Sequence, residues 1–281
     1  MATNQMRRDA AKRKLASQQA RRAQQAARRR QIAVISSAAV VVLVLVAVVA
    51  LSTIGRGGND PASATPSDAA NATSAAAQPA ASGPGTCAYP SDGSAAKQNT
   101  PPPADGVSNE GTVSVAMTTS AGPIGLTLNR AEAPCTVNSF VSLAGQGYFD
   151  GTSCHRLTTG EGLKVLQCGD PTGTGTGGPG YTIPDEVPTT LAPSPSGQGA
   201  VTYPRGTLAM AKTAQPNSGG SQFFLVYADS TLPPEYTVFG TIDDAGLKTI
   251  DDVAAAGADD SNGAGDGKPK TPIDIQTVTV S

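Results

Sequence analysis

The chain signals its fold most directly in residues 112–128, which read TVSVAMTTSAGPIGLTL. Large apolar and smaller side chains alternate on both sides of Gly122-Pro123, and the apolar positions are Val113, Val115, Met117, Ile124, Leu126 and Leu128. Alternate side chains of a strand point to the same face, and a Gly-Pro pair favours a turn. The segment therefore predicts a β-hairpin with one buried face.

The sequence after this hairpin continues with short strands and only two helical segments. Pro134 opens the first predicted helix, where apolar side chains follow a helical spacing as far as Gly145 and Gly147. A second helix is predicted over 247–255. Short strands are predicted at 154–157, 165–168, 207–211, 223–227, 237–242 and 273–280. Many strands and two helices favour an antiparallel barrel or sandwich with helices covering its ends.

Before the hairpin, the sequence consists of three segments that differ in composition. Residues 1–31 form a basic tail with ten Lys or Arg and one acidic residue. Residues 32–54 carry no charge and, at 1.5 Å per residue, are long enough to cross the ~30 Å hydrocarbon core as a single transmembrane helix. Residues 55–108 are rich in Ala, Ser and Pro and predict a disordered tether. Residues 109–281 form the predicted compact domain.

A cleavable signal peptide is the alternative interpretation of the apolar segment, because it also places basic residues before apolar ones. The segment is longer than a signal peptide requires, and no cysteine follows it closely as a lipid-attachment site, so an uncleaved anchor is favoured. The excess of Lys and Arg before it predicts a single-pass protein of the cell membrane with a cytoplasmic N-terminus and an extracytoplasmic domain. The tail then either fixes this topology or binds anionic lipid or nucleic acid.

Composition argues against several function classes. Trp is absent and Phe and Tyr together number eleven, which leaves little for a base-stacking platform and argues against a nucleic-acid reader. Neither a nucleophile triad nor a paired-histidine metal site is apparent, so we expect no metal and no cofactor. The glycine-rich residues 173–178 lack the Lys-Ser or Lys-Thr ending of a phosphate loop and predict a flexible loop beside a cleft.

Seven segments of the compact domain resemble, in order, those of the cyclophilins. They are Thr136-Val137-Asn138-Ser139-Phe140, Cys154-His155-Arg156, Gln167-Cys168-Gly169-Asp170, Gly175-Thr176-Gly177-Gly178, Gly206-Thr207-Leu208-Ala209-Met210-Ala211, Gly220-Ser221-Gln222-Phe223-Phe224 and Val238-Phe239-Gly240. The resemblance covers residues 112–281. It implies an all-β fold, an eight-stranded antiparallel barrel capped by two helices. It also implies peptidyl-prolyl cis-trans isomerase activity on proline-containing segments, which the predicted location makes those of exported or cell-envelope proteins.

The same resemblance implies a set of site residues. The catalytic positions are Arg156, which donates hydrogen bonds to the substrate, Gln167, which orients it, and Phe224, which lines the proline pocket. The implied substrate-binding positions are Val165, Ala211, Lys212, Gln222, Leu232 and Tyr236. Strand alternation places Phe223 in the core and Phe224 in the cleft. It also turns His155, the single histidine, away from Arg156, so a structural role is favoured for it.

The sequence departs from the family pattern at three places. The turn Thr158 to Lys164 is longer by about three residues, and Leu163 or Lys164 replaces a pocket phenylalanine. Thr231 stands where many members have tryptophan, which implies weak cyclosporin binding, and Lys212 stands where asparagine is common. The altered pocket wall leaves open a non-catalytic proline-peptide binding or chaperone module, and a purely structural spacer is a third hypothesis. We expect a monomer.

Four cysteines lie on the predicted oxidising side of the membrane: Cys87, Cys135, Cys154 and Cys168. Four cysteines allow three pairings. A regular ladder between the strands of Cys154 and Cys168 would point these two side chains to opposite faces, so that bridge is the least favoured. The other two pairings stay open, as do free thiols. A bridge from Cys87 to the barrel would pin the end of the tether to the domain.

Overall fold

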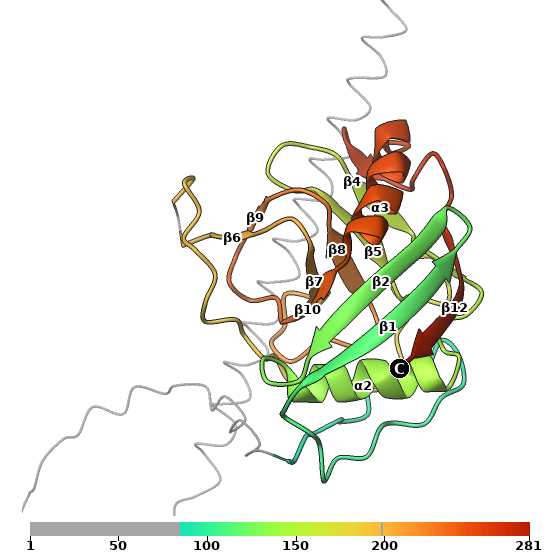
Figure 1. The fold of residues 1–281 in the computed structure, drawn as a ribbon, viewed down its shortest axis with the longest axis vertical. Coiled ribbons are helices and arrows are strands. Elements are labelled where there is room, and N and C mark those ends of the chain that lie inside the picture. Colours follow the sequence, from blue (N-terminus) through green and yellow to red (C-terminus); the bar gives the residue numbers. More distant parts are fainter. Residues whose placement is uncertain (1–84, 198) are drawn as a thin grey trace, which may run out of the picture. The chain divides into compact units, whose positions relative to one another are not determined.

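One curled antiparallel sheet dominates the computed structural model, which describes residues 85–197 and 199–281 (Figure 1). Its strand order is β11-β4-β5-β8-β7-β10-β2-β1-β12-β3. The bounds are β1 Thr112–Thr119, β2 Gly122–Asn129, β3 Thr152–Ser153, β4 Arg156–Thr158, β5 Val165–Cys168, β7 Thr207–Met210, β8 Phe223–Val226, β10 Val238–Ile242, β11 Asp266–Gly267 and β12 Asp274–Val280. A separate two-stranded sheet pairs β6 (Val201–Tyr203) with β9 (Ser230–Leu232).

The sheet curls until its two ends approach each other. β3 is the last strand at one end and β4 the second strand at the other, yet only Cys154 and His155 separate them in the chain. The three steps from Ser153 to Arg156 span at most about 11 Å, so the ends of the sheet lie close together. The eight strands of this sheet that are longer than two residues form the predicted all-β barrel, and β3 and β11 add short pairings at its ends.

The register of the sheet aligns residues of four neighbouring strands in rows, and one row belongs to the core while the next points to the other side of the sheet. Leu157, Leu166, Leu225 and Leu208 lie opposite one another on β4, β5, β8 and β7, and all four are fully buried. Because directly opposed residues share a face and successive residues alternate, the adjacent row must point to the other side of the sheet. That other side carries the candidate site.

Two helices accompany the sheet in the described part of the chain, α2 at Pro134–Gly145 and α3 at Asp244–Ala256. They lie toward opposite ends of the barrel in Figure 1. Pro134 occupies the first turn of α2 and confirms the predicted start of this helix. The second helix begins three residues earlier than its apolar pattern indicates, because the Asp243 carboxylate caps it by accepting a hydrogen bond from the Gly246 N–H at 2.7 Å.

The part of the predicted tether from residue 85 onward packs on the domain, which corrects that prediction for 85–108. Cys87 and Val107 are buried. The Tyr89 hydroxyl donates to the Cys135 carbonyl at 2.9 Å, and Lys97 Nζ donates to the carbonyl of Gly147 at 2.7 Å. A few anchors and backbone hydrogen bonds thus hold a segment whose average composition resembles a linker. The tail, the anchor and the earlier part of the tether lie outside the described residues.

The structure contains two disulfides, Cys87–Cys135 and Cys154–Cys168. The first joins the segment before β1 to α2 and not to a strand of the barrel. The two bridges together make up the least favoured of the three pairings, so that prediction was wrong. It assumed a regular ladder, but β4 starts only at Arg156 and the Cys154 N–H donates to Ile273, so the chain has left the β4–β5 register at Cys154.

Within the part of the chain that the structure describes, no helix combines the length and the apolarity needed to cross a bilayer.

Candidate functional site

The row next to the four leucines carries three of the predicted site residues side by side. Arg156 on β4 lies opposite Gln167 on β5, Gln167 lies opposite Phe224 on β8, and Phe224 lies opposite Ala209 on β7. This register places a cation, an amide and an aromatic ring on one face of the sheet. Phe223 belongs to the main core and Phe224 to a second cluster, so the predicted alternation is confirmed.

A chain of hydrogen bonds links the polar members of this face. Arg156 Nη1 donates to Gln167 Oε1 at 3.2 Å, and Gln167 Nε2 donates to Gln222 Oε1 at 2.9 Å. Gln222 Nε2 in turn donates to the Gly177 carbonyl at 3.0 Å. The two glutamines are thereby fixed in orientation, because each amide oxygen accepts and each amide nitrogen donates. Together they hold one edge of the guanidinium group in place.

Sequence reasoning did not find the strongest partner of Arg156, which is Asp266 on β11. Arg156 Nε and Nη2 donate to the two carboxylate oxygens of Asp266 at 2.9 and 2.7 Å. The hydrogen bonding of Arg156 to Asp266 is the largest cause that raises the pKa of Arg156, and it also lowers the pKa of Asp266. Both groups therefore stay charged around neutral pH.

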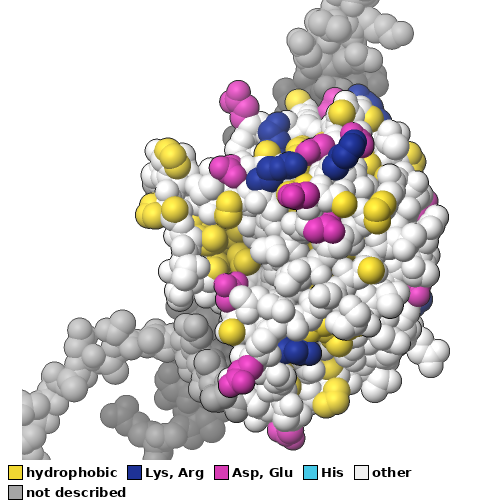
Figure 2. Space-filling model, in the orientation of Figure 1, with side chains coloured by type: hydrophobic (Ala, Val, Ile, Leu, Met, Phe, Trp, Pro, Cys, Tyr) yellow, Lys and Arg dark blue, Asp and Glu magenta, His cyan; other side chains and the backbone are white. Residues whose placement is uncertain are grey.

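Beside the polar residues lies a second apolar cluster, separate from the main core. Its buried members are Val165, Tyr203, Ala209, Phe224 and Val226, and Leu163, Leu191, Val201, Ala211, Leu232, Tyr236 and Val238 pack against it with partial exposure. Hydrophobic side chains gather on the side of the molecule that carries β6 and β9 (Figure 2). The structure thus brings the predicted pocket residues together. It also selects Leu163, not Lys164, as the side chain that replaces the phenylalanine.

Tyr203 is a member of this cluster that the sequence did not reveal. It is fully buried, and its hydroxyl lies 3.2 Å from the carbonyl oxygens of Pro233 and Tyr236. The rings of Phe224 and Tyr236 meet edge to face with centroids 5.6 Å apart. Burial raises the pKa of Tyr203 to about 12, so its hydroxyl keeps its proton. Tyr203 thereby fixes the segment that carries Tyr236.

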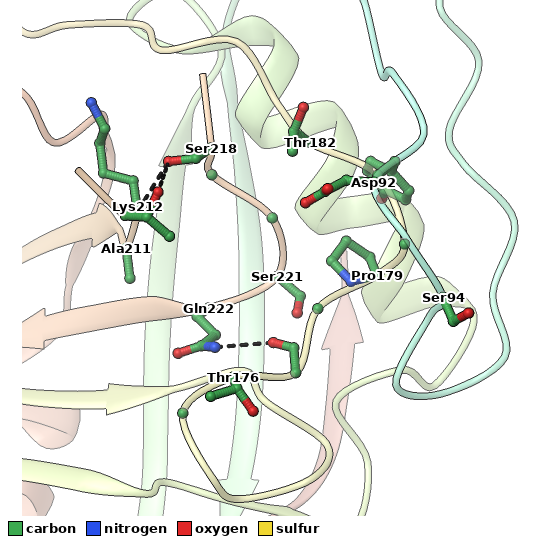
Figure 3. A pocket seen from close by; sticks show the side chains of 18 of the residues that line it. Asp92, Ser94, Thr176, Pro179, Thr182, Ala211, Lys212, Ser218, Ser221 and Gln222 are labelled. Atoms are coloured by element: carbon green, nitrogen blue, oxygen red, sulfur yellow. Dashed lines mark hydrogen bonds between the residues drawn. The ribbon is translucent and has the colours of Figure 1, made fainter. Parts of the chain in front are cut away.

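A pocket of about 410 Å³, here called the polar pocket, adjoins the two glutamines. Figure 3 shows Gln222 among the side chains that line it. Gln167, Gln222, Ala211 and Lys212 line it, together with residues 175–182 and residues 218–221. Asp92 and Ser94 from the segment before β1 complete its wall. Lys212 Nζ donates to Asp185 Oδ2 at 2.9 Å, and both side chains are mostly buried. The predicted substrate-binding residues therefore divide between this pocket and the apolar cluster, and Ala211 borders both.

The glycine-rich loop wraps around Asp170 at the edge of the pocket. The backbone N–H groups of Thr172, Thr174, Gly175 and Thr176 donate to the Asp170 carboxylate at 2.7–3.1 Å. Burial alone would raise the pKa of Asp170, but the hydrogen bonds from Thr172 and the loop outweigh it and lower the pKa to about 2. The N–H groups that a phosphate would need are thus occupied by the chain's own carboxylate.

His155 lies against this loop and has a lowered pKa. Burial is the main cause, and Arg156 contributes to the same direction. Neither ring nitrogen has a hydrogen-bond partner among residues 85–197 and 199–281. The imidazole is therefore neutral around pH 7 and carries no charge to the site.

An antiparallel barrel that places an arginine–glutamine pair beside an apolar cluster with aromatic rings is the architecture of a cyclophilin. A family model described as cyclophilin type peptidyl-prolyl cis-trans isomerase/CLD matches residues 114–280, and the chain belongs to this family.

Two relatives with high sequence identity are mycobacterial proteins called probable peptidyl-prolyl cis-trans isomerase B. The one from Mycobacterium leprae is 56% identical over 196 residues, which are 68% of this chain and 65% of the relative. The one from Mycobacterium tuberculosis is 60% identical over 168 residues, 59% of this chain and 54% of the relative. The chain thus matches about half to two thirds of the length of these relatives. A crystal structure of a cyclophilin type isomerase from Cryptosporidium parvum is 30% identical with a TM-score of 0.48, and the match covers 61% of this chain and 98% of that chain.

Proposed function

We propose that the compact domain accelerates the cis-trans isomerisation of X-Pro peptide bonds. The observation that carries this proposal is the row in which Arg156, Gln167 and Phe224 lie directly opposite one another on adjacent strands. It sets a fixed cation beside an apolar pocket on one continuous surface. Membership of the cyclophilin family supports the same reaction.

The reaction needs a site that holds the twisted amide better than either planar form. Amide resonance opposes rotation with a barrier of ~18–20 kcal/mol, and no covalent bond has to break. Only interactions that are stronger in the transition state raise the rate. Arg156 supplies such an interaction, because its guanidinium donates toward the prolyl carbonyl and amide nitrogen as the amide loses its resonance. Its charge does not depend on pH in the physiological range.

The apolar cluster supplies the binding energy and fixes the proline ring. Phe224 and Val165 form the buried base of the pocket, while Leu163, Leu232 and Tyr236 form its partly exposed walls. Gln222 and Ala211 lie at the boundary with the polar pocket, where the substrate backbone would run. Lys212 lies farther along the same path, and its pairing with Asp185 removes a free positive charge from it.

We also propose that the chain is a single-pass membrane protein with its isomerase domain outside the cytoplasm. The 23 charge-free residues at 32–54 and the basic residues before them support this topology. The two disulfides agree with an oxidising compartment. The substrates would then be proline-containing segments of exported or cell-envelope proteins. Thr231 at the tryptophan position supports weak cyclosporin binding, and we expect a monomer.

The test compares the full chain with Arg156→Ala in a prolyl-peptide isomerisation assay. Loss of a preorganised donor to the transition state is expected to lower the rate about 100-fold. Arg205→Ala is the matched control, because Arg205 also forms a bidentate pair with an aspartate, Asp251, but on α3. A rate within threefold of the unmodified chain would refute the role of Arg156. Peptide binding without any acceleration by the unmodified chain would favour the non-catalytic proline-peptide binding or chaperone module.

A further inference from the structure

The guanidinium of Arg156 is held on two edges by two different side chains. Asp266 engages Nε and Nη2, and Gln167 engages Nη1. A guanidinium has five N–H donors, so two have no partner among the described residues, one on each terminal nitrogen. The plane of the group is therefore fixed before any peptide arrives, and both terminal nitrogens keep one N–H for a substrate.

The loop that presents Asp266 is itself built around a second carboxylate. Asp259 Oδ1 accepts hydrogen bonds from the N–H groups of Ser261 at 3.0 Å and Lys268 at 2.8 Å. Asn262 Nδ2 donates to Asp266 Oδ1 at 3.2 Å, and the Asn262 N–H donates to the Asp266 carbonyl at 3.0 Å. Gly267 allows the close approach, because a Cβ there would lie 2.0 Å from Asp259 Oδ1.

This loop also joins the sheet beside β4, the strand that carries Arg156. β11 pairs with β4, with Asp266 opposite Thr158 and Gly267 opposite Leu157. The carboxylate thus reaches Arg156 from a strand that lies 110 residues away in sequence. Side-chain exposures of 33% for Arg156 and 28% for Asp266 show that the pair lies at the surface of the domain rather than in its core.

We propose that Asp266 is a positioning residue of the isomerase site, which holds Arg156 in the orientation that presents its remaining N–H groups to the substrate amide. This inference rests on the proposed function and deepens it. An arginine at a half-exposed site would otherwise lose rotamer freedom in each catalytic cycle. A charge-assisted bidentate pair fixes the Arg156 rotamer before the substrate binds, so this conformational entropy is not lost in the catalytic cycle. The pair also adds directional specificity. As a positioning residue, Asp266 acts through Arg156, so we expect its effect on the rate at saturation and not on peptide affinity.

The test uses the full chain with Asp266→Asn and Asp266→Ala, and Asp259→Asn as the control. Asp259→Asn perturbs the same loop but removes no contact to Arg156. Isomerisation of a saturating proline peptide is measured by exchange NMR, and peptide Kd by titration. We expect Asp266→Ala to lower the saturated rate about tenfold, which corresponds to ~1.4 kcal/mol, with Asp266→Asn intermediate. Kd should change less than about twofold, and Asp259→Asn should retain most of the rate.

A spectroscopic measurement separates positioning from a general effect on the fold. In 15N-labelled protein, the Arg156 Nε–Hε resonance should shift and exchange faster with water in both Asp266 variants, and should stay unchanged in Asp259→Asn. The proposal is overturned if the Asp266 variants isomerise as fast as the unmodified chain. It is also overturned if Asp259→Asn loses as much rate as Asp266→Ala while its Arg156 Nε–Hε resonance stays unchanged. An unmodified chain that does not accelerate isomerisation would instead refute the proposed function.

Discussion

Replacing Cys87 and Cys135 together by alanine is expected to lower the free energy of unfolding by about 4 kcal/mol. The bridge closes a loop with a sequence separation of 48. The chain-entropy relation for a cross-link of that span gives about 4 kcal/mol at 25 °C. Alanine is the suitable replacement, because both cysteines are buried and serine would add an unsatisfied hydroxyl.

The matched control is the double replacement of Cys154 and Cys168, whose loop has a separation of 14. The same relation gives about 3 kcal/mol for it. Equilibrium unfolding in guanidinium chloride, followed by far-UV circular dichroism, measures both. The extrapolated free energies must be compared and not the midpoints, because removing a cross-link expands the denatured state and raises the m-value. A loss below 1 kcal/mol for the Cys87 and Cys135 pair, or one smaller than that of the control, would refute the reasoning.

Three further predictions concern side chains around the site. Asp170→Asn should lower the free energy of unfolding at pH 7 by about 2 kcal/mol, because the pKa of Asp170 is about 2 in the folded chain against 3.8 ordinarily. This contribution is present above pH 4 and is lost as the pH falls toward 2. The unfolding free energy of the variant should therefore depend less on pH between pH 4 and pH 2. Tyr203→Phe should lower the free energy of unfolding, measured with denaturant, by about 1 kcal/mol. It should also lower kcat/KM, since the hydroxyl fixes the segment that carries Tyr236. An unchanged kcat/KM would argue against that role. Lys212→Met should destabilise the fold by about 3 kcal/mol, because it leaves the buried Asp185 carboxylate unpaired. In a double-mutant cycle, adding Asp185→Asn should restore part of this loss. Strict additivity of the two changes would contradict an interaction between the two side chains.

The barrel could be predicted because its strands carry their own signal. The hairpin of residues 112–128, the start of α2 at Pro134 and the opposite faces of Phe223 and Phe224 all follow from alternation or from local chemistry. Such patterns depend only on neighbours in sequence. The pocket residues were implied by the resemblance to the cyclophilins, whose motifs lie on these strands.

The partners of the site could not be predicted, because they depend on contacts distant in sequence. Asp266 lies in a loop of Gly, Asp and Asn without any periodic pattern, and only the pairing of β11 with β4 brings it to Arg156. Tyr203 belongs to a short strand between turns. The Cys154–Cys168 bridge required knowing that the ladder begins only after Cys154. The packing of residues 85–108 could not be predicted from composition either, because backbone hydrogen bonds and a few anchoring side chains hold this segment.

The Cys87–Cys135 bridge gives the domain a defined mechanical attachment point. A pulling force on the chain before Cys87 passes through the covalent bridge into α2, bypassing the residues between the two cysteines. Asp92 and Ser94, which line the polar pocket, lie within that bypassed stretch. While the bridge is intact, tension on the preceding chain is therefore carried by the helix, and the pocket wall keeps its shape under strain.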